Sequence, residues 1–335
     1  MTGAGESPAT TSPGVANVAA EMQAAVAAVA GADQVTLVCH VNPDGDALGS
    51  TLGLLHVLRA AGRNVTASFP NPFIIAPHYQ LLPGLELLTP PAEVPTEPEV
   101  MVTFDCGSLD RLGDLEPNAK AAHELVVIDH HISNTRYGSI NVIDPDAAAS
   151  GWIALQLVDG LGLPLNRDAA VCLYAALVCD TGRFQYETTT PAVFDMARRL
   201  TEFDVPVATL SRTLFEEHRF AYLQLLGDAL HNAQLVREQR FVWTAITQEM
   251  LERHGVEMEE IEGLIDILRR TSEAEVTCVL KEEVDGRIRV SLRSLGDVDV
   301  SRVAEAHGGG GHRYAAGFTS DLDLETCVAR IRAAL

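Results

Sequence analysis

The sequence feature that most constrains the fold is an apolar run that ends in three polar residues able to bind a metal ion. Residues 124–128 (Glu-Leu-Val-Val-Ile) lead directly into Asp129, His130 and His131. A continuous run of this length is typical of a buried strand in a parallel sheet, and such sheets gather ligand groups at the carboxyl ends of their strands. The run therefore predicts a strand that delivers one carboxylate and two imidazoles to a site.

The same arrangement occurs twice earlier in the chain. The apolar run 35–39 leads into the loop 40–46, and the run 100–104 leads into Asp105. A further aspartate follows the apolar run 171–179. Together these positions form a set of imidazole and carboxylate groups that suits divalent cations. The candidate ligands and their neighbours are His40, Asp44, Asp46, Asp105, Asp129, His130, His131 and Asp180.

Helix-like segments alternate with these strand-like runs. Residues 47–61 carry leucines at helical spacing, and Gly62 stands where a helix cap belongs. Residues 64–69 have the pattern of a second strand. This alternation predicts an α/β fold with a doubly wound, mainly parallel sheet.

The later part of the chain has a different pattern, which predicts a smaller second α/β domain. In the earlier part, helical periodicity covers 16–30, 147–161, 167–179 and 191–203. In the later part, helical periodicity covers 258–270 and 324–334, and strand-like runs cover 239–247, 275–281 and 288–295. The segment 209–235 is helical and charged, as expected of a connection. The predicted divisions are a flexible leader at 1–15, a first domain at 16–190, a helical linker at 191–235 and a second domain at 236–335.

The spacing of the ligands predicts a two-metal site. The loop 40–46 supplies three ligands from one turn built by Pro43 and Gly45, while Asp105 stands alone where it could bridge two ions. Two ions about 3.5 to 4 Å apart can hold a phosphate and a bridging hydroxide between them. Mixed imidazole and carboxylate ligation favours Mn²⁺ over Ca²⁺, with Mg²⁺, Co²⁺ and Fe²⁺ left open.

A run of four glycines between His307 and His312 has two interpretations. It could be a flexible linker, or a loop whose backbone N–H groups approach a phosphate or a base closely. The flanking histidines and the preceding strand favour the second interpretation. On that strand, Arg293 could donate two hydrogen bonds to a phosphate.

Charge and hydropathy exclude several classes of protein. The 46 acidic and 24 basic residues give a net charge of −22, which argues against broad binding of long duplex nucleic acid. A short phosphate substrate remains compatible, because bound divalent ions would reverse the local field. No apolar run approaches the roughly 18 residues of a membrane helix. The first thirty residues contain no Lys or Arg, so we expect no secretory signal and a cytoplasmic protein.

These motifs resemble those of a known family, the DHH phosphoesterase superfamily. Its four motifs are matched by His40-x-Asn42-x-Asp44-x-Asp46, Asp105, Asp129-His130-His131-x-x-Asn134 and Asp180-Thr-Gly. The segment Ser291-Leu-Arg293-Ser294 and the run Gly308 to His312 resemble the associated DHHA1 domain. Size and architecture resemble the bifunctional oligoribonuclease (nanoRNase) and 3′-phosphoadenosine 5′-phosphate phosphatase subgroup, including actinobacterial members that cleave cyclic dinucleotides.

The resemblance implies a role for each matching residue. One metal ion would bind His40, Asp44 and Asp105, and a second would bind Asp46, Asp105, His130 and Asp180. His131 would contact the scissile phosphate and Asp129 would orient the histidines. The implied substrate-binding residues are Asn134, Ser291, Arg293, Gly309, Gly310, Gly311 and His312. The resemblance also implies a homodimer, and an active site in the cleft between the DHH and DHHA1 domains.

The expected function is therefore metal-dependent phosphoester hydrolysis through a two-metal-activated hydroxide. Expected substrates are short oligoribonucleotides, linear and cyclic dinucleotides such as pApA and cyclic di-AMP, and 3′-phosphoadenosine 5′-phosphate. A manganese-dependent inorganic pyrophosphatase would share the metal motifs but not the glycine-rich histidine loop. A RecJ-like single-strand exonuclease would need a larger chain and a more basic channel. A nucleotide sensor without turnover is a third alternative, disfavoured by the intact ligand set.

Overall fold

The computed structural model describes residues 13–335, with side chains from Asn17 onward except at His312. Most of the predicted leader therefore lies outside the described residues. The first helix, α1 (Pro13–Gly31), begins at Pro13 and not at residue 16. The described residues divide into two compact units, the first formed by 13–74 together with 82–207, and the second by 75–81 together with 208–335.

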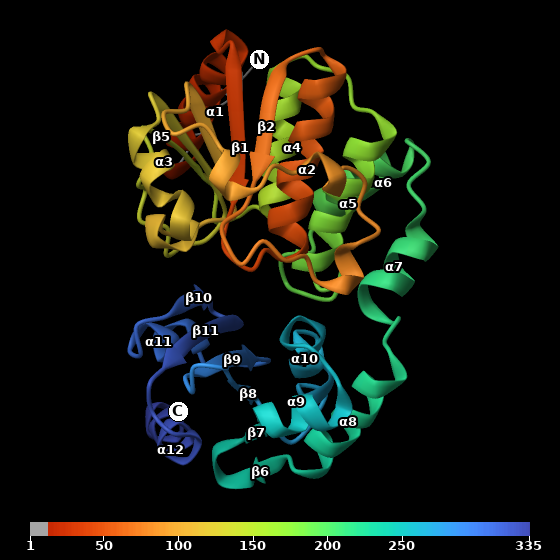
Figure 1. Ribbon diagram of the computed structural model, residues 1–335, viewed down its shortest axis with the longest axis vertical. Coiled ribbons are helices and arrows are strands. Elements are labelled where there is room, and N and C mark those ends of the chain that lie inside the picture. Colours follow the sequence, from red (N-terminus) through yellow and green to blue (C-terminus); the bar gives the residue numbers. More distant parts are fainter. Residues whose placement is uncertain (1–12) are drawn as a thin grey trace, which may run out of the picture. The chain divides into compact units, whose positions relative to one another are not determined.

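The first unit is built around five parallel strands in the order β2-β1-β3-β4-β5 (Figure 1). The strands are β1 (Gln34–Cys39), β2 (Asn64–Ser68), β3 (Val100–Phe104), β4 (Glu124–Asp129) and β5 (Ile140–Ile143). The chain runs from β1 outward to β2 and then returns to the other side of β1 for β3. This reversal lies between β1 and β3, and in open α/β sheets ligands bind at the carboxyl ends of the strands on either side of such a point. The predicted doubly wound parallel sheet is confirmed.

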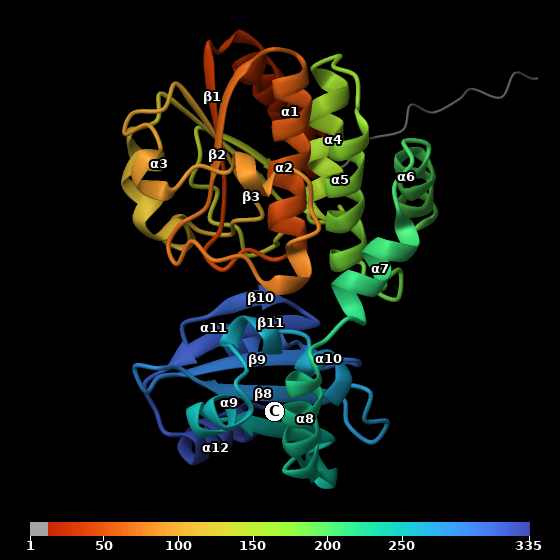
Figure 2. The ribbon, with the colours of Figure 1, turned by 45° about the vertical axis from the view of Figure 1, so that its right-hand side comes forward.

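Helices cover both faces of this sheet (Figure 2). One face carries α1 together with α2 (Gly45–Ala60) and α4 (Ser150–Gly160). Helix α5 (Arg167–Asp180) packs on α2 and α4, and α6 (Pro191–Thr201) packs on α5. The opposite face carries η4 (Leu109–Leu115) and α3 (Glu116–Ala121), which enclose Val38, Met101 and Leu125 in one apolar cluster. Because both faces are covered, the central strand β3 is buried along its whole length. This explains why its sequence is a continuous apolar run.

The proline-rich stretch between β2 and β3 consists of loops and short helices. It contains η1 (Pro77–Tyr79), η2 (Leu85–Leu87) and η3 (Pro91–Glu93). Within the described residues, no helix is both long enough and apolar enough to cross a membrane.

The second unit contains a mixed sheet in the order β10-β11-β9-β8-β7-β6, in which only β7 and β8 are parallel. Its strands are β6 (Gln234–Val236), β7 (Phe241–Ile246), β8 (Val276–Glu282), β9 (Ile288–Ser294), β10 (Gly310–His312) and β11 (Ala315–Ser320). One face packs on α11 (Val300–Glu305) and α12 (Leu324–Ala334). The other packs on α8 (Phe220–His231), α9 (Gln248–His254) and α10 (Leu264–Leu268). Helix α7 (Val207–Phe215) precedes α8.

Two predicted helices differ from the structure. The segment 258–270 is not one helix, because a short turn η6 (Met258–Ile261), closed by reciprocal hydrogen bonds between Glu257 and Glu260, is separated from α10 by Gly263. Glycine is a poor helix former, which favours the break. The helix predicted from residue 147 begins at Ser150, because residues 144–149 form a loop that contacts the first unit's site.

The glycine run is also different from the predicted loop. Gly310 and Gly311 belong to the edge strand β10, which pairs antiparallel with β11. A Cβ on Gly309 would collide with the carbonyl oxygen of Gly317, and a Cβ on Gly311 would lie 2.5 Å from the carbonyl oxygen of Ala315. Close packing against β11 therefore requires glycine at these positions, and the flexible-linker interpretation is wrong.

Candidate metal centre

The end of β1 and the start of α2 place three polar side chains within one turn. His40 follows β1, and its Nδ1 atom lies 2.8 Å from the carbonyl oxygen of Val41. Asp44 caps α2, since its Oδ1 atom accepts hydrogen bonds from the backbone N–H groups of Asp46 and Ala47, both at 3.0 Å. Aspartate is favoured at this position because it satisfies N–H groups that the helix leaves unpaired. The cap fixes Asp44 and directs the fully buried Asp46 inward.

Asp105 follows the central strand β3 in an uncommon backbone conformation. Its φ angle is 54°, in the left-handed region that aspartate tolerates better than most residues. Its Oδ2 atom lies 3.4 Å from Nε2 of His40, and its Oδ1 atom lies 3.5 Å from Nε2 of His130. The residue is 4% exposed, so one buried carboxylate faces imidazoles from two different loops.

His130 extends from the end of β4 with its two ring nitrogens in different environments. The Nδ1 atom lies 3.1 Å from the carbonyl oxygen of Ala147, whereas Nε2 lies 3.1 Å from Oδ2 of Asp180 and 3.8 Å from Oδ2 of Asp46. Because a carbonyl can only accept, Nδ1 is the protonated nitrogen of the neutral ring, as it is in His40. Nε2 is then the nitrogen of each ring that a metal ion would bind, since metal-binding histidines commonly donate their other N–H to a carbonyl or carboxylate oxygen.

These contacts bring all six predicted metal ligands together. Donor atoms within 4.8 Å of one another fall into three groups: His40, Asp44 and Asp105; Asp46, His130 and Asp180; and Asp105, His130 and His131. Asp105 and His130 each belong to two of the groups. The groups combine carboxylate oxygens with imidazole nitrogens, and this donor set fits a divalent cation.

The electrostatics of the cluster also fit bound cations. Burial, together with the charges of Asp105 and Asp180, raises the pKa of Asp46 well above its ordinary value. Burial and the neighbouring carboxylates raise the pKa of Asp180 to about 6. For His130 burial opposes protonation, but Asp180 and Asp105 outweigh it and raise the imidazole pKa. In the absence of metal, protons therefore neutralise part of this crowded negative charge, and divalent ions would replace them.

Asp129 contacts His131 directly, and Asn134 in turn hydrogen-bonds Asp129. The Oδ1 atom of Asp129 lies 2.7 Å from Nδ1 of His131 and accepts the backbone N–H of His130 at 2.8 Å. The amide nitrogen of Asn134 donates both to Asp129 and to the carbonyl oxygen of Cys106. The Asn134 amide oxygen accepts the backbone N–H of Arg136. In this structure Asn134 supports Asp129, so its expected contact with substrate stays a prediction.

The segment 147–151 makes contacts that the sequence pattern did not reveal. The backbone N–H groups of Ser150 and Gly151 donate to the two oxygens of Asp46 at 2.6 and 2.9 Å, and the Ser150 hydroxyl donates to Asp105 at 3.0 Å. Ser50, one turn along α2, also donates to Asp46. A run of small residues before an apolar helix was the only available signal. It indicates close packing but not a carboxylate partner.

The predicted substrate-binding residues outside the DHH motifs belong to the second unit. Ser291 and Arg293 alternate with buried residues along β9, so both project from the same face of the sheet. Gly309, Gly310 and Gly311 lead into and form β10. The side chain of His312 lies outside the described part of the chain. Contact between these residues and substrate stays a prediction.

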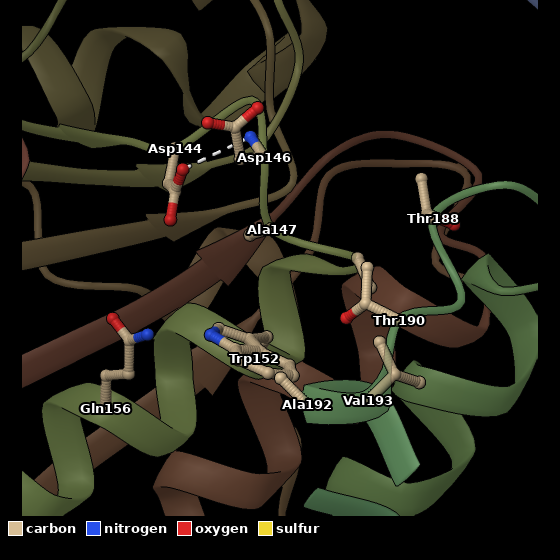
Figure 3. Close-up of a pocket in the computed structure, with 10 residues that line it drawn as sticks. Asp144, Asp146, Ala147, Trp152, Gln156, Thr188, Thr190, Ala192 and Val193 are labelled. Atoms are coloured by element: carbon tan, nitrogen blue, oxygen red, sulfur yellow. Dashed lines mark hydrogen bonds between the residues drawn. The ribbon is translucent and has the colours of Figure 1, made fainter. Parts of the chain in front are cut away.

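A separate cavity of about 300 Å³ opens in the first unit beside the loop 144–149 (Figure 3). Asp144, Asp146, Trp152, Thr188 and Thr190 contribute to its lining, and the backbone N–H of Asp146 donates to Asp144 at 3.2 Å. No basic side chain is among its described lining residues and none of the predicted metal ligands lines it. This cavity therefore does not have the chemistry of a phosphate site.

Comparison with known proteins agrees with this geometry. The model of the DHH family N-terminal domain matches residues 34–177, and that of the DHHA1 domain matches residues 241–335. The bifunctional oligoribonuclease and PAP phosphatase of Thermus thermophilus is 30% identical, with 89% of this chain and 87% of that protein covered. The protein of the same description from Bacillus subtilis is also 30% identical, over 85% of this chain and 88% of that protein.

Two further comparisons extend the likeness. The cyclic-di-AMP phosphodiesterase of Geobacillus thermodenitrificans is 23% identical over 92% of this chain and 48% of that longer protein. The crystal structure of an exopolyphosphatase-related protein from Bacteroides fragilis has a TM-score of 0.85 at 24% identity, with 94% of this chain and 95% of that chain covered. The latter similarity supports the fold alone. With the DHH motifs gathered at one sheet edge, the chain belongs to the DHH family and is a hydrolase of phosphate esters, with a DHH domain followed by a DHHA1 domain.

Proposed function

We propose that this phosphoesterase cleaves short oligoribonucleotides and linear or cyclic dinucleotides to mononucleotides, and converts 3′-phosphoadenosine 5′-phosphate to AMP. The observation that carries the proposal is the position of Asp105 between the two sets of potential metal ligands: its Oδ2 atom lies 3.4 Å from Nε2 of His40, and its Oδ1 atom lies 3.5 Å from Nε2 of His130. Such a position is suited to two ions that clamp one phosphate. The names of the Thermus, Bacillus and Geobacillus relatives support small nucleotides as the substrate class.

The cofactors in this proposal are two divalent ions, with Mn²⁺ preferred and Mg²⁺ or Co²⁺ as alternatives. His40, Asp44 and Asp105 would hold one ion, and Asp46, Asp105, His130 and Asp180 the other. When bound, the ions would lower the pKa of a water molecule and neutralise charge on the phosphate.

The protein's own groups would complete the chemistry. Asp129 holds the Nδ1 atom of His131, so the ring can present Nε2 to a phosphate oxygen. Burial opposes protonation of His131, but Asp129 raises its pKa, which favours a cationic ring that can donate to the phosphate. Asp129 and His131 are therefore the proposed catalytic pair, with Asp129 acting through His131.

The second unit would bind the nucleotide that does not react. Ser291 and Arg293 on β9, with the backbone of Gly309, Gly310 and Gly311 and the side chain of His312, are the proposed contacts. Binding energy from this remote portion would then be used to accelerate cleavage at the reacting phosphate. We also propose domain boundaries near residues 190 and 236, a cytoplasmic location, and a homodimer, the last of which rests on the family resemblance.

A substrate panel tests the proposal against its alternatives. Purified protein with Mn²⁺ is incubated with pApA, cyclic di-AMP, 3′-phosphoadenosine 5′-phosphate, pyrophosphate and a long single-stranded RNA, and kcat/KM is compared. We expect the small nucleotides to exceed pyrophosphate and the long RNA by at least about a hundredfold. Dominant pyrophosphate hydrolysis would identify a pyrophosphatase, and processive degradation of the long strand would identify an exonuclease. Tight nucleotide binding without metal-dependent turnover would identify a sensor.

A further inference from the structure

One face of the second unit's sheet carries a row of cationic side chains. Arg289, Ser291 and Arg293 alternate with buried residues along β9 and therefore share a face. On the neighbouring strand β8, Lys281 is directly opposite Arg289 and is only 1% exposed. Two like charges in directly opposite positions repel each other. The row must therefore be stabilised by carboxylates from the elements packed on this face.

Glu262, between η6 and α10, neutralises one end of the row. Its Oε2 atom lies 2.7 Å from Nζ of Lys281, and its Oε1 atom lies 2.9 Å from Nη2 of Arg289. Glu283 adds a second carboxylate 2.9 Å from Nε of Arg289. Both cations at this end therefore lie within 2.9 Å of a carboxylate oxygen.

Arg293, at the other end of the row, is held much more loosely. Its Nε atom lies 3.8 Å from Oδ1 of Asp266, and Nη1 donates at 3.1 Å to the adjacent carbonyl of Leu292. Both Nε of Arg293 and Oδ1 of Asp266 are shielded from solvent, and neither forms a hydrogen bond within the part of the chain that the structure describes. Asp266 also lies 3.2 Å from Nε of Arg269, which divides its charge between two arginines. Arg293 is thus the cation of this row with the weakest carboxylate contact.

We propose that Asp266 is a specificity-determining residue that competes with the substrate's phosphate for Arg293. The inference rests on the proposed role of Arg293 in binding the nucleotide that does not react. A phosphate that pairs with Arg293 would lie several ångströms from the fixed negative charge of Asp266. A terminal phosphate monoester carries nearly two negative charges at pH 8 and is repelled about twice as strongly as a diester. Asp266 therefore weakens binding of a terminal phosphate on that nucleotide more than it weakens binding of an internal linkage.

The test compares pApA with ApA, which differ only in the terminal phosphate. Asp266→Asn removes the charge and keeps the size of the side chain. We expect kcat/KM at pH 8 to rise by about tenfold for pApA and by less than about threefold for ApA, because a unit charge several ångströms away acts mainly on the dianion. Asp285→Asn is the matched control, since Asp285 is a surface carboxylate of the same unit that pairs with Arg287. It should leave both substrates unchanged. If the asparagine variant is unstable, the same kinetic comparison is made with Asp266→Ser, which removes the same charge.

Combination with Arg293→Ala separates the inference from the function on which it rests. If Asp266 acts through Arg293, its substitution should give less than a twofold gain in the Arg293→Ala background. A gain that persists there would overturn the inference, because the charge would then act through Arg269 or the overall field. If Arg293→Ala impairs pApA cleavage but Asp266→Asn brings no selective gain, the inference fails while the role of Arg293 stands. If Arg293→Ala affects no dinucleotide, both fail.

Discussion

The Nδ1 atom of His131 lies 2.7 Å from Oδ1 of Asp129, a carboxylate that is completely buried. The same oxygen accepts the backbone N–H of His130. Burial alone would raise the pKa of Asp129, but the neighbouring His131 outweighs this effect and lowers the pKa. Asp129 is therefore an anion whose direction is fixed from two neighbouring residues. It orients the His131 ring and stabilises the proton on Nδ1, whether the ring is neutral or cationic.

The first prediction follows from this pair. Asp129→Asn keeps the shape of the side chain but lets the amide present either nitrogen or oxygen to His131. We expect kcat for pApA to fall by about ten- to a hundredfold while bound metal is retained, because groups that orient active-site histidines typically contribute this much. Steady-state kinetics and metal analysis check the prediction. Loss of metal in parallel with activity would instead mean that Asp129 acts chiefly on the ligand His130.

The second prediction concerns Asp105, which belongs to two of the ligand groups. Asp105→Ala should lower kcat/KM by about a thousandfold or more, equivalent to roughly 4 kcal/mol of transition-state stabilisation, and should reduce bound Mn²⁺. Asp110→Ala, an exposed aspartate a few residues further along the chain, is the control and should behave as the wild type. Near-normal turnover of the Asp105 variant at saturating Mn²⁺ would contradict the two-ion assignment.

The third prediction is a pH dependence of metal binding. The raised pKa values of His130 and of Asp180, the latter about 6, mean that the metal-free site carries protons near neutral pH. Metal binding requires the deprotonated groups, so lowering the pH opposes it. The apparent affinity for Mn²⁺ should fall between pH 8 and pH 5, approaching about tenfold per pH unit for each proton released. Calorimetry in buffers of different ionisation enthalpy would detect the release. Equal affinities at both ends of this range would refute the prediction.

The fourth prediction separates substrate holding from chemistry. Arg293→Ala and His312→Ala should each reduce kcat/KM for dinucleotides by about ten- to a hundredfold, the value of a lost charge-assisted contact of roughly 1.5 to 3 kcal/mol. Turnover of a small chromogenic phosphodiester and metal content should change little, because that substrate lacks a second nucleotide. Arg287→Ala removes a surface arginine of the same unit and serves as the control. Equal losses on both substrates would place these residues at the reacting phosphate.

The fifth prediction concerns the packing of α4. A Cβ on Gly151 would lie 2.6 Å from Cβ of Ala176 and 3.4 Å from Oδ1 of Asp46. Gly151→Ala should therefore destabilise the protein by about 1 to 3 kcal/mol through overpacking. Gly227→Ala is a matched helical substitution with open space around it, and it should stabilise by up to about 1 kcal/mol. Urea denaturation of both variants measures the change in the free energy of unfolding. An unchanged midpoint for Gly151→Ala would contradict the prediction.

Much of the first unit was predictable because its chemistry is encoded locally. The runs ending at Cys39, Phe104 and Ile128 are largely apolar, and each is followed by a polar residue at a sheet edge. The same stretch of sequence therefore predicts both the strand and the ligand that follows it. The contact between Ser150 and Asp46 joins residues 104 positions apart, and no spacing rule connects them. Strand β10 was not predicted because glycine has low strand propensity, and the pairing is imposed by β11.

The segment 147–151 has a practical consequence for anyone who alters this protein. This segment contacts residues that follow three different strands. The carbonyl of Ala147 contacts His130 after β4, and the hydroxyl of Ser150 contacts Asp105 after β3. The N–H groups of Ser150 and Gly151 contact Asp46, in the segment after β1. A one-residue insertion there would misplace three contacts simultaneously, whereas an insertion in the exposed hairpin at Asp285 would misplace none of them. The hairpin is therefore the place for a label or tag, and the segment 147–151 should be transferred intact with the metal ligands whenever the site is grafted onto another scaffold.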